Sequence, residues 1–466
     1  MDLHRDDERT AWREHLGGLL RERRVVCGIA PLAAFTDWVH LLRAAGARRP
    51  LLVASAVGAG AVPGADEAEV VFVDVPRRAT MTEDLRLQDA IAHRLPDEVR
   101  RRVDEYDPGR EAVWLVGPFI GTAPIDRRPV LTGRPDAWVA LEDKLVADQV
   151  WDAVGARRAP SLVAPVELGE LRRASTTLDL GQGVVLAGDA RDGFNGGGDF
   201  VRWVAGDEDL ATATAFFASR CDQVRVMPFL EGVPCSIHGI VLPDGTAVFR
   251  PVELSILRAP SRRFVYGGLG TTWDPPVDDR ADMRELTRRT GEHLRSRAGY
   301  RGAFGIDGVL TADGFRPTEI NTRMSGGIAS LARQVDATLF NLLQFNLLAD
   351  RDPGIDVAAL ESWALPLMDS RRLTKAIAMA PGSVADRPLD LHVTWDGRAL
   401  TRSSTESGWS VSVGPSSAGT YVRLNAPPES LDGHRVADLN VALMRFLDVE
   451  LGTDFGDVTA AVDVRR

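Results

Sequence analysis

Lysine is almost absent from this sequence. Of the 55 lysine and arginine residues, only Lys144 and Lys375 are lysines. A chain that uses arginine so consistently gives a mild reason to examine a lysine that it keeps, although chance retention is the alternative. Lys144 follows Glu142 and Asp143 and is a candidate functional residue.

Cysteine and long apolar runs are also scarce. The three cysteines, Cys27, Cys221 and Cys235, have no CxxC spacing, so the sequence indicates neither a disulfide framework nor a zinc site. The charged N-terminus has no apolar signal-peptide core, and the best membrane candidate, Leu51–Val62, is too short and too rich in Gly and Ala. We therefore expect a cytoplasmic protein with no membrane partner.

An excess of positive charge is lacking as well. The net charge of −11 argues against a nucleic-acid partner, although it is compatible with local basic pockets. The apolar and charged fractions, 44% and 26%, are ordinary for a globular protein. A chain of 466 residues is long enough for two to four domains with sizeable cores.

The most informative segment is a predicted hairpin near residue 313. Two apolar runs, 303–310 and 315–322, flank a short loop that ends in glycine, which is typical of a hairpin. If the turn centres on Asp313, then Asp307 lies opposite Glu319. Asn321 and Arg323 then share their face, because side chains alternate along a strand.

This face has the chemistry of a metal and phosphate site. Two directly opposed carboxylates repel each other by up to about 1 kcal/mol, and a divalent cation removes that penalty. The oxygens of Asp307, Glu319 and Asn321 suit magnesium. Arg323 would hold phosphate oxygens or stabilise charge during group transfer. The alternative is a solvated strand face with one Arg–Glu pair.

The same residues carry a family resemblance. Glu319-Ile320-Asn321-Thr322-Arg323, with Asp307 upstream in Gly305-Ile306-Asp307, resembles the metal-binding end of the ATP-grasp superfamily. The preceding Gly299-Tyr300-Arg301-Gly302-Ala303 resembles the same region of biotin carboxylase. The resemblance implies ATP and two magnesium ions as cofactors.

The rest of the chain is read as α/β and α+β domains in the order that this resemblance implies. Apolar runs alternate with helical stretches up to the Pro-rich linker 124–135, which predicts a mostly parallel, doubly wound sheet. We expect a Rossmann-like domain over 1–135, with helical stretches at Asp37–Ala45 and Glu83–Tyr106. An ATP-grasp domain over 136–350 would have a first lobe at 136–228 and a second at 229–350. A small α+β domain over 351–466 would cap the cleft or form a homodimer contact.

The nucleotide pocket is expected from three segments. Lys144, on a predicted helix Asp136–Val154, is similar in position to the lysine that the family places on the nucleotide phosphates. The glycine loop 188–198 includes Gly196, Gly197 and Gly198, whose backbone N–H groups can approach phosphate unobstructed. The alternative for Lys144 is an exposed lysine on a helix. The alternative for the glycine loop is the mobile tip of a hairpin.

The hinge 224–234 resembles the connection that holds adenine in the family. By this resemblance Met227, Phe229 and Leu230 would enclose the ring, and Glu231 would contact the ribose. The strand before the glycine loop departs from the family. It carries Leu186 and Ala187 where a second phosphate lysine is usual, and Arg191 is offered as compensation.

Substrate contacts are expected from two further segments. The segment 251–270 is read as a loop that carries Glu253, Arg258 and Arg263, which suit a phosphate or a carboxylate. Ser325, Gly326 and Gly327 begin a helix predicted to run to about Asp350, and its free N–H groups offer an anion site. A plain surface cluster of arginines is the alternative for the loop. Cys235 and His238 are read as strand residues.

The function that follows is an ATP-dependent carboxylate–amine ligase. Segments 188–193 and 227–276 are similar to the pheganomycin-type peptide ligase subgroup, which implies peptide bond formation in natural product biosynthesis. Lys144, Arg323 and Arg258 would be the catalytic residues, and the partners would be a small carboxylate and an amine or peptide. An ATP-grasp kinase and a nucleotide-binding module without turnover are the alternatives.

Overall fold

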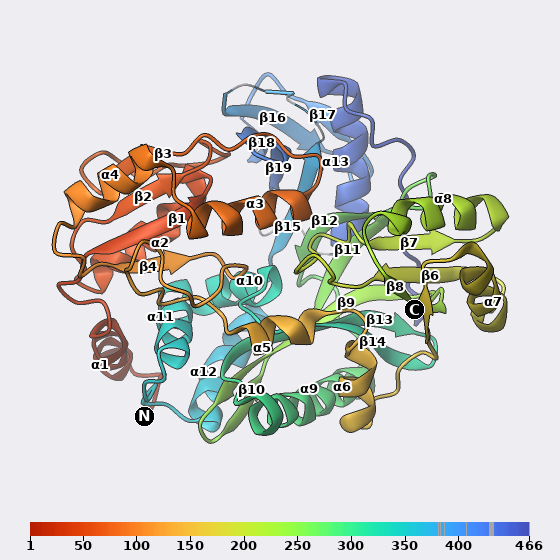
Figure 1. Ribbon diagram of the computed structural model, residues 1–466, viewed down its shortest axis with the longest axis horizontal. Helices are drawn as coiled ribbons and strands as arrows, with labels where there is room; N and C mark the ends of the chain where they lie inside the picture. Colours follow the sequence, from red (N-terminus) through yellow and green to blue (C-terminus); the bar gives the residue numbers. More distant parts are fainter. Residues whose placement is uncertain (381, 383, 386, 407, 428–432, 466) are drawn as a thin grey trace.

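The computed structural model describes residues 1–380, 382, 384–385, 387–406, 408–427 and 433–465 (Figure 1). Its strands form two four-stranded sheets and one eleven-stranded sheet. Within the described residues, no helix has the length and apolar character needed to cross a membrane.

The N-terminal sheet is parallel and has helices on both faces. Its order is β3-β2-β1-β4, and each neighbouring pair is parallel. Alternate residues of its strands pack into two different apolar cores, because Cys27 and Leu52 face one side whereas Val26 and Val53 face the other. The elements are β1 (Val25–Ala30), β2 (Leu51–Ala54), β3 (Glu69–Phe72), β4 (Val113–Val116), α1 (Asp6–Gly17), η1 (Leu32–Phe35), α2 (Thr36–Ala44), α3 (Met81–His93) and α4 (Asp97–Tyr106). The expectation of a parallel, doubly wound sheet is confirmed.

Three of the predicted long helices are broken. The stretch 83–106 contains two helices, α3 and α4, because Pro96 lacks the N–H that a continuous helix would need there. The stretch 136–154 contains α5 (Asp136–Val139), the short turn η2 (Ala140–Glu142) and α6 (Ala147–Ala153). The helix expected to reach Asp350 divides into α10 (Gly326–Val335) and α11 (Ala337–Leu348), because the Asp336 carboxylate caps a new helix.

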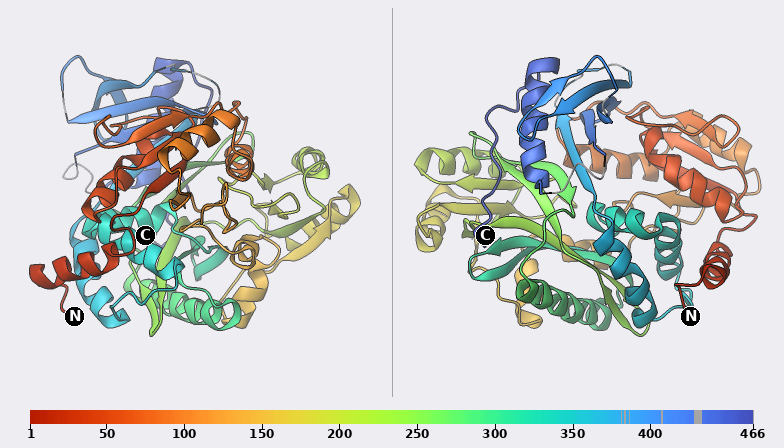
Figure 2. Two further views of the ribbon diagram at one scale, coloured as in Figure 1. Left: turned by 60° about the vertical axis from the view of Figure 1, so that its left-hand side comes forward. Right: turned by 180° about the vertical axis from the view of Figure 1, so that it is seen from behind.

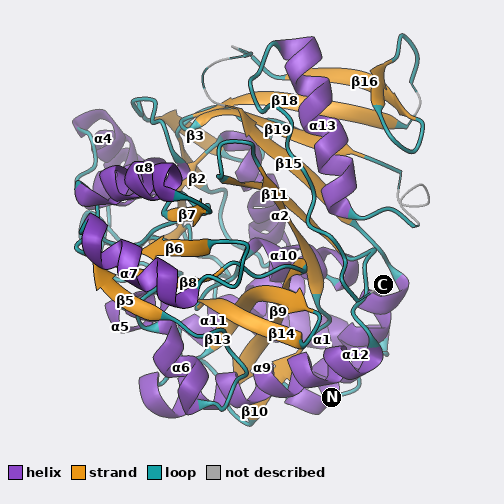
Figure 3. Cartoon of the chain, turned by 90° about the vertical axis from the view of Figure 1, so that its right-hand side faces the viewer, coloured by secondary structure: helices purple, strands orange, loops and turns teal. Residues whose placement is uncertain are grey.

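A second, antiparallel sheet lies within residues 136–228, the predicted first lobe. Its order is β5-β8-β6-β7, and α7 and α8 pack on one face around a separate apolar core. Figure 3 shows these two helices on the outer side of the sheet. The elements are β5 (Leu162–Pro165), α7 (Leu168–Leu178), β6 (Val184–Gly188), β7 (Val201–Val204), α8 (Asp207–Ala218) and β8 (Gln223–Pro228).

The eleven-stranded sheet extends from residue 233 to residue 425. Its path is β14-β13-β9-β11-β12-β15-β19-β18-β16-β17, with β10 paired to β9, and the pairs are antiparallel. The strands are β9 (Val233–Leu242), β10 (Gly245–Val248), β11 (Val252–Arg258), β12 (Phe264–Gly270), β13 (Gly302–Thr311), β14 (Gly314–Asn321), β15 (Thr374–Ala380), β16 (Leu389–Trp395), β17 (Leu400–Arg402), β18 (Trp409–Ser416) and β19 (Gly419–Asn425). The predicted boundary at 350 therefore crosses one continuous sheet.

Helices cover this sheet on several sides. Helix α9 (Val277–Ala298) packs against β9 and β10, and α12 (Val357–Ser370) packs against β10. Helix α13 (Val436–Leu451) packs against β11, β12 and β15, as the rear view of Figure 2 shows. In the same view the N-terminal sheet and the β5–β8 lobe lie at opposite ends of the molecule. The large sheet thus lies between the other two and brings their loops to one region.

Candidate active site at the β13–β14 hairpin

The hairpin pairs the two acids that the sequence predicts to be opposed. Asp307 is the direct partner of Glu319. The turn is one residue tighter than expected, because Thr311 pairs with Gly314. A bulge at Thr318 then shifts the register by one residue and restores the expected pairing at the acids.

Asn321 joins the acid pair. Its Nδ2 donates a hydrogen bond to Asp307 Oδ2 at 2.9 Å, and its Oδ1 is buried with no hydrogen-bond partner among the described residues. Burial and the negative charge of Glu319 raise the pKa of Asp307 to about 6. An unpaired buried amide oxygen beside two repelling carboxylates is a site at which a cation would relieve several unfavourable interactions.

Lys144 reaches the same acids from another element. It lies in the connection between η2 and α6 rather than on the predicted helix, and its side chain is almost fully buried. Its ammonium group forms an ion pair with the Glu319 carboxylate. The structure therefore brings the retained lysine to the hairpin.

Arg323 is held by a buried ion-pair network. Its guanidinium pairs with Glu142, which also pairs with Arg134 at 2.5 Å. Burial raises the pKa of Glu142, but the charges of Arg323 and Arg134 outweigh it and lower that pKa overall. The Arg323 guanidinium also lies 4.7 Å from the centre of the Phe119 ring. Sequence reasoning missed Glu142 as the residue that positions Arg323, although it stands two residues before Lys144.

The donor set fits a hard divalent cation better than a soft one. In the part of the chain that the structure describes, no cluster of three or more His, Cys, Asp or Glu side chains is placed to bind a metal. The hairpin instead offers two carboxylates and one amide oxygen, a set typical of magnesium sites that also take phosphate oxygens and water. Asp307, Glu319 and Asn321 could hold such an ion.

The glycine loop packs against helix α3 of the N-terminal region. Gly196 and Thr82 on α3 exchange two hydrogen bonds, both 3.0 Å, and Arg86 donates to Asn195 at 2.8 Å. Gly197 and Gly198 have φ values of +64° and +74°, which favour glycine. The loop is thus tied to α3 at one end, which the sequence did not indicate.

A buried positive charge lies on β8, the strand that pairs with the strand before this loop. Leu186 and Ala187 are buried, and Ala187 pairs with Arg225 on β8. Arg225 is buried, forms an ion pair with Asp148 at 2.6 Å and donates to the carbonyl of Thr318 in the hairpin bulge at 2.9 Å. A lone arginine in an otherwise apolar strand was the sequence signal for it.

Arg191, the suggested compensation, forms ion pairs at the surface of the lobe, and its role at the nucleotide stays a prediction. Its guanidinium pairs with Asp192 at 3.1 Å and with Asp222 at 3.2 Å on the exposed edge of the lobe. These two carboxylates balance the positive charge of Arg191 in this structure.

The hinge residues form a small apolar cluster between the two lobes. Met227 and Phe229 are buried together with Val185, and the Trp203 ring stacks on Phe229 at 4.5 Å. Leu230 lies outside this cluster and is half-buried. The cluster has the flat, apolar character that suits a purine ring.

Glu231 and Arg258 lie next to this cluster as a pair. Arg258 Nη2 donates to Glu231 Oε1 at 2.6 Å, and its guanidinium lies 4.9 Å from the centre of the Phe229 ring. The ion pair joins the hinge to the segment 251–270. The two predicted site residues therefore bind each other in this structure.

The segment 251–270 is a strand pair rather than a loop. It forms β11 and β12, joined by a turn in which Arg262 has a φ of +59°. Arg263 follows this turn, and its carbonyl accepts a hydrogen bond from the Ala259 N–H at 2.9 Å. The expectation of a loop over 251–270 is wrong, because β11 pairs with β9 and β12 pairs with β15.

Glu253 does not lie in a position to contact substrate. Its side chain is fully buried on β11, where it pairs with Arg435 at 2.7 Å and accepts the Val436 N–H at the start of α13 at 3.1 Å. Two partners on α13 satisfy its carboxylate, so Glu253 anchors that helix to the sheet.

The start of α10 lies beside the hairpin. Ser325 is the N-cap residue, Gly326 faces the Tyr266 hydroxyl, and a side chain on Gly327 would meet the His238 ring at 2.2 Å. His238 and Cys235 are buried in β9, as predicted for strand residues. Burial lowers the pKa of His238 to about 3, so the imidazole under the helix is neutral.

Comparison with known proteins identifies the fold. No protein-family model and no curated protein sequence matches this chain. Solved structures do match over nearly the whole length. The chain resembles an L-amino acid ligase from Bacillus licheniformis with a TM-score of 0.54, 13% identity and coverage of 92% of this chain and 98% of that one. The chain has an ATP-grasp fold.

Two further ATP-grasp structures contain nucleotide. One is the biotin carboxylase domain of the Hydrogenobacter thermophilus 2-oxoglutarate carboxylase, a dimer with MgADP and bicarbonate (TM-score 0.54, 12% identity, 94% and 91% coverage). The other is a carboxyaminoimidazole ribonucleotide synthase from Aspergillus clavatus with ATP (TM-score 0.53, 11% identity, 94% and 100% coverage). Identities this low establish the fold alone.

Proposed function

We propose that this protein is an ATP-dependent ligase that joins a carboxylate to an amine. The observation that carries the proposal is the opposed pair Asp307 and Glu319, with the unpaired oxygen of Asn321 beside it and Lys144 on the far side. This concentration of charge is costly for the folded protein unless a charged ligand binds there. The ATP-grasp fold supports ATP as that ligand.

The chemistry proposed is formation and capture of an acyl phosphate. The substrate carboxylate attacks the γ-phosphorus of ATP, the bond to ADP breaks, and an acyl phosphate forms. The amine then attacks the acyl carbon and releases inorganic phosphate. Magnesium held by Asp307, Glu319 and Asn321 would neutralise phosphate oxygens.

The chain's own residues hold the reactants and balance charge. Lys144 can exchange its bond to Glu319 for a phosphate oxygen, and Arg323 is fixed by Glu142 so that its charge is oriented in advance. The apolar cluster of Met227 and Phe229 would bind the adenine, and the glycine loop would cover the phosphates. A peptide or amino acid is the proposed amine, and specialised peptide biosynthesis is the proposed setting of the reaction.

The test is ADP release with a library of amino acids, peptides and guanidino acids, followed by the mass of each product. We expect an amide product, and trapping by hydroxylamine as the hydroxamate of the activated acid. An acid-stable phosphorylated product would instead identify a kinase. Absence of ADP with every substrate would identify a binding module.

The variants Asp307→Asn and Glu319→Gln test the metal assignment within the same assay. Both should lower the rate of ADP release by at least about 10²-fold, whereas Asp313→Asn at the exposed turn should not change it. If the first two variants release ADP at the wild-type rate, the hairpin does not hold the metal.

A further inference from the structure

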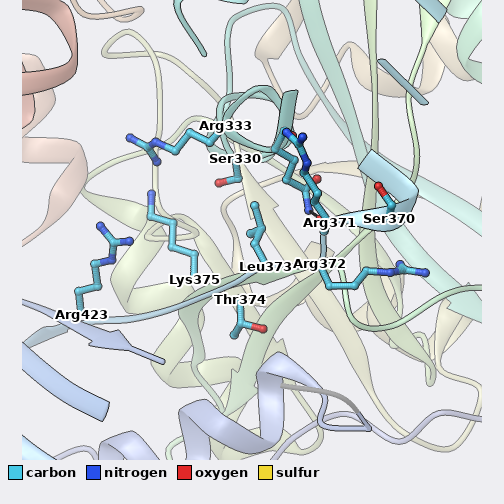
Figure 4. A pocket seen from close by; sticks show the side chains of 10 residues that line it. Ser330, Arg333, Ser370, Arg371, Arg372, Leu373, Thr374, Lys375 and Arg423 are labelled. Atoms are coloured by element: carbon cyan, nitrogen blue, oxygen red, sulfur yellow. Dashed lines mark hydrogen bonds between the residues drawn. The ribbon is translucent and has the colours of Figure 1, made fainter. Parts of the chain in front are cut away.

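A second charged pocket lies on the same sheet, beyond the hairpin. It has a volume of about 640 Å³. Figure 4 shows its lining side chains, which come from α10, from the end of α12, from the connection that follows it, from the start of β15 and from β19. The residues are Ser330, Arg333, Gln334, Ser370, Arg371, Arg372, Leu373, Thr374, Lys375 and Arg423.

The pocket gathers positive charge without enough negative charge to balance it. In Figure 4 the side chains of Lys375, Arg333 and Arg423 gather on one side of the pocket. Arg333 has one exposed partner, Asp37, at 2.9 Å. In the part of the chain that the structure describes, Lys375 and Arg423 have no carboxylate within ion-pair distance. Like charges so close repel one another, and an anion between them would remove the repulsion.

The other two arginines of the pocket serve the fold. Arg372 pairs with Asp274 at 2.7 Å, and Arg371 donates to the carbonyl of Gln334 at 2.8 Å. Arg372 also points away from Lys375 in Figure 4. Lys375 and Arg423, which have no carboxylate partner among the described residues, therefore lie together with Arg333 on the side of the pocket away from Arg372.

Strand alternation explains why Lys375 faces the pocket. On β15, Ala376 and Ala378 are buried in the core that includes α13, so Lys375 and Ile377 project from the opposite face. Ile377 pairs with Arg423 on β19. Burial makes the largest contribution to lowering the pKa of Lys375 to about 8, and the positive charges of Arg333 and Arg423 contribute the rest.

Three strands of the sheet separate this pocket from the hairpin. Along the sheet, the hairpin strands β14 and β13 are followed by β9, β11 and β12, and only then by β15 and β19. Lys375 lies on β15 and Arg423 lies on β19. A group bound by these cations is therefore distinct from the group that reacts at the hairpin.

We propose that Lys375, Arg423 and Arg333 bind a second anionic group of the substrate, a carboxylate or a phosphate, which takes no part in bond formation. The substrate then carries at least two anionic groups. The anion site follows from the pocket alone, whereas its use by a substrate rests on the proposed ligase function.

The first experiment measures binding without turnover. Glutarate and inorganic phosphate are titrated calorimetrically into the full chain at pH 7 without nucleotide. We expect a dissociation constant of about 1 mM or tighter for one of them, and the tighter probe shows whether the group is a carboxylate or a phosphate. Lys375→Gln and Arg423→Gln should each weaken binding about tenfold or more. Arg402→Gln is the matched control. Arg402 lies on β17 and forms an exposed ion pair with Glu450, so this variant should bind the probe as the wild type does.

Three outcomes of this titration overturn the anion site. The first is absence of binding by both probes. The second is equal binding by Lys375→Gln and the wild type. The third is loss of binding in Lys144→Gln with retention in Lys375→Gln, which would place the probe at the hairpin instead.

A pH series adds a readout that a purely structural role would not change. Arg333 on α10 and Arg423 on β19 are the charged groups that face Lys375. Probe binding should weaken between pH 7 and pH 9 as the ammonium loses its proton, and Lys375→Arg should keep binding and remove this decline. A decline that persists in Lys375→Arg contradicts the assignment.

The second experiment separates this inference from the proposed function. Substrate pairs that differ by one carboxylate, such as peptides with Glu or Gln, are compared by ADP release. We expect a lower KM for the anionic member, and loss of that preference in Lys375→Gln with kcat nearly unchanged. ADP release without any such preference contradicts the substrate inference alone. Probe binding without ADP release from any substrate contradicts the ligase function alone.

Discussion

The hairpin and the basic pocket each concentrate charge of one sign, but they balance it differently. At the hairpin, Lys144 pairs with Glu319, and Asn321 donates to Asp307. In the pocket, Asp37 balances only Arg333 among the three facing cations that the structure describes. A ligand at the hairpin must therefore displace protein contacts, whereas an anion in the pocket meets charges that are already available. Helix α10 links the two, since it begins beside the hairpin and carries Ser330 and Arg333 into the pocket.

The largest effect should come from removal of one hairpin charge. Asp307→Asn or Glu319→Gln should lower the rate of ADP release by at least about 10²- to 10³-fold, because each removes a group placed to balance charge in the transition state. Steady-state ADP release measures this effect. Thermal unfolding serves as the control, since the single acid left behind still has Lys144 nearby. A similar loss of activity in Lys375→Gln with a small substrate would mean that the two regions are not distinct.

A smaller loss is expected from Lys144→Gln. It should lower ADP release about 10- to 10²-fold, because Arg323 and the magnesium remain to balance the phosphates. Lys144→Arg keeps the charge and should recover part of the rate, which single-turnover kinetics can measure. Unchanged turnover in Lys144→Gln would show that the ion pair with Glu319 only stabilises the fold.

The link through α10 can be tested with adjacent glycines. Gly327→Ala should lower the free energy of unfolding by about 1–3 kcal/mol, because its new methyl group would overlap the buried His238 ring. Gly326→Ala is the matched control, since the methyl carbon that it adds would lie 3.9 Å from its nearest neighbour, the Tyr266 hydroxyl oxygen. Urea denaturation gives both values. Equal stability of the two variants would contradict the packing of α10 on His238.

The smallest effect concerns the unbalanced pocket. Lys375→Gln should raise the free energy of unfolding at pH 7 by about 1–2 kcal/mol, after allowance for solvent screening. The sign follows because the pKa of Lys375 is about 8 in the folded protein and higher in the unfolded chain, so the folded state carries the cost of the charge at pH 7. The difference between variant and wild type should shrink between pH 8 and pH 10.5. Urea denaturation at pH 7 and pH 10 measures it, and a destabilised variant at pH 7 would contradict the view that the pocket charge is unbalanced.

Sequence patterns predicted the hairpin well because its determinants are local. Alternation and a glycine-ended turn placed Asp307 opposite Glu319, which the structure confirms. The pairing nevertheless depends on the bulge at Thr318, which no local pattern indicated. The predicted turn centre was off by half a residue, and the bulge compensated for it.

Contacts between distant segments were much harder to predict. Glu253 looked like part of a basic loop, yet its partner Arg435 is 182 residues away. The binding of the glycine loop to Thr82 and the approach of Arg225 to the hairpin bulge likewise depend on how the three sheets assemble. Lys144 was recognised by a resemblance and by the rarity of lysine in the chain. Its ion pair with Glu319 became apparent only in the folded structure.

The continuity of the large sheet also bears on how the chain can be made and shortened. Strand β12 pairs with β15 through Gly268, Leu269 and Gly270. During synthesis β12 is complete about a hundred residues before β15 emerges. Until then, the backbone N–H and C=O groups on the edge of β12 that pairs with β15 have no strand partner. A chain ended at residue 350 would keep that open edge permanently and would be prone to self-association. The last quarter of the protein is thus needed to close the sheet on which the hairpin is built.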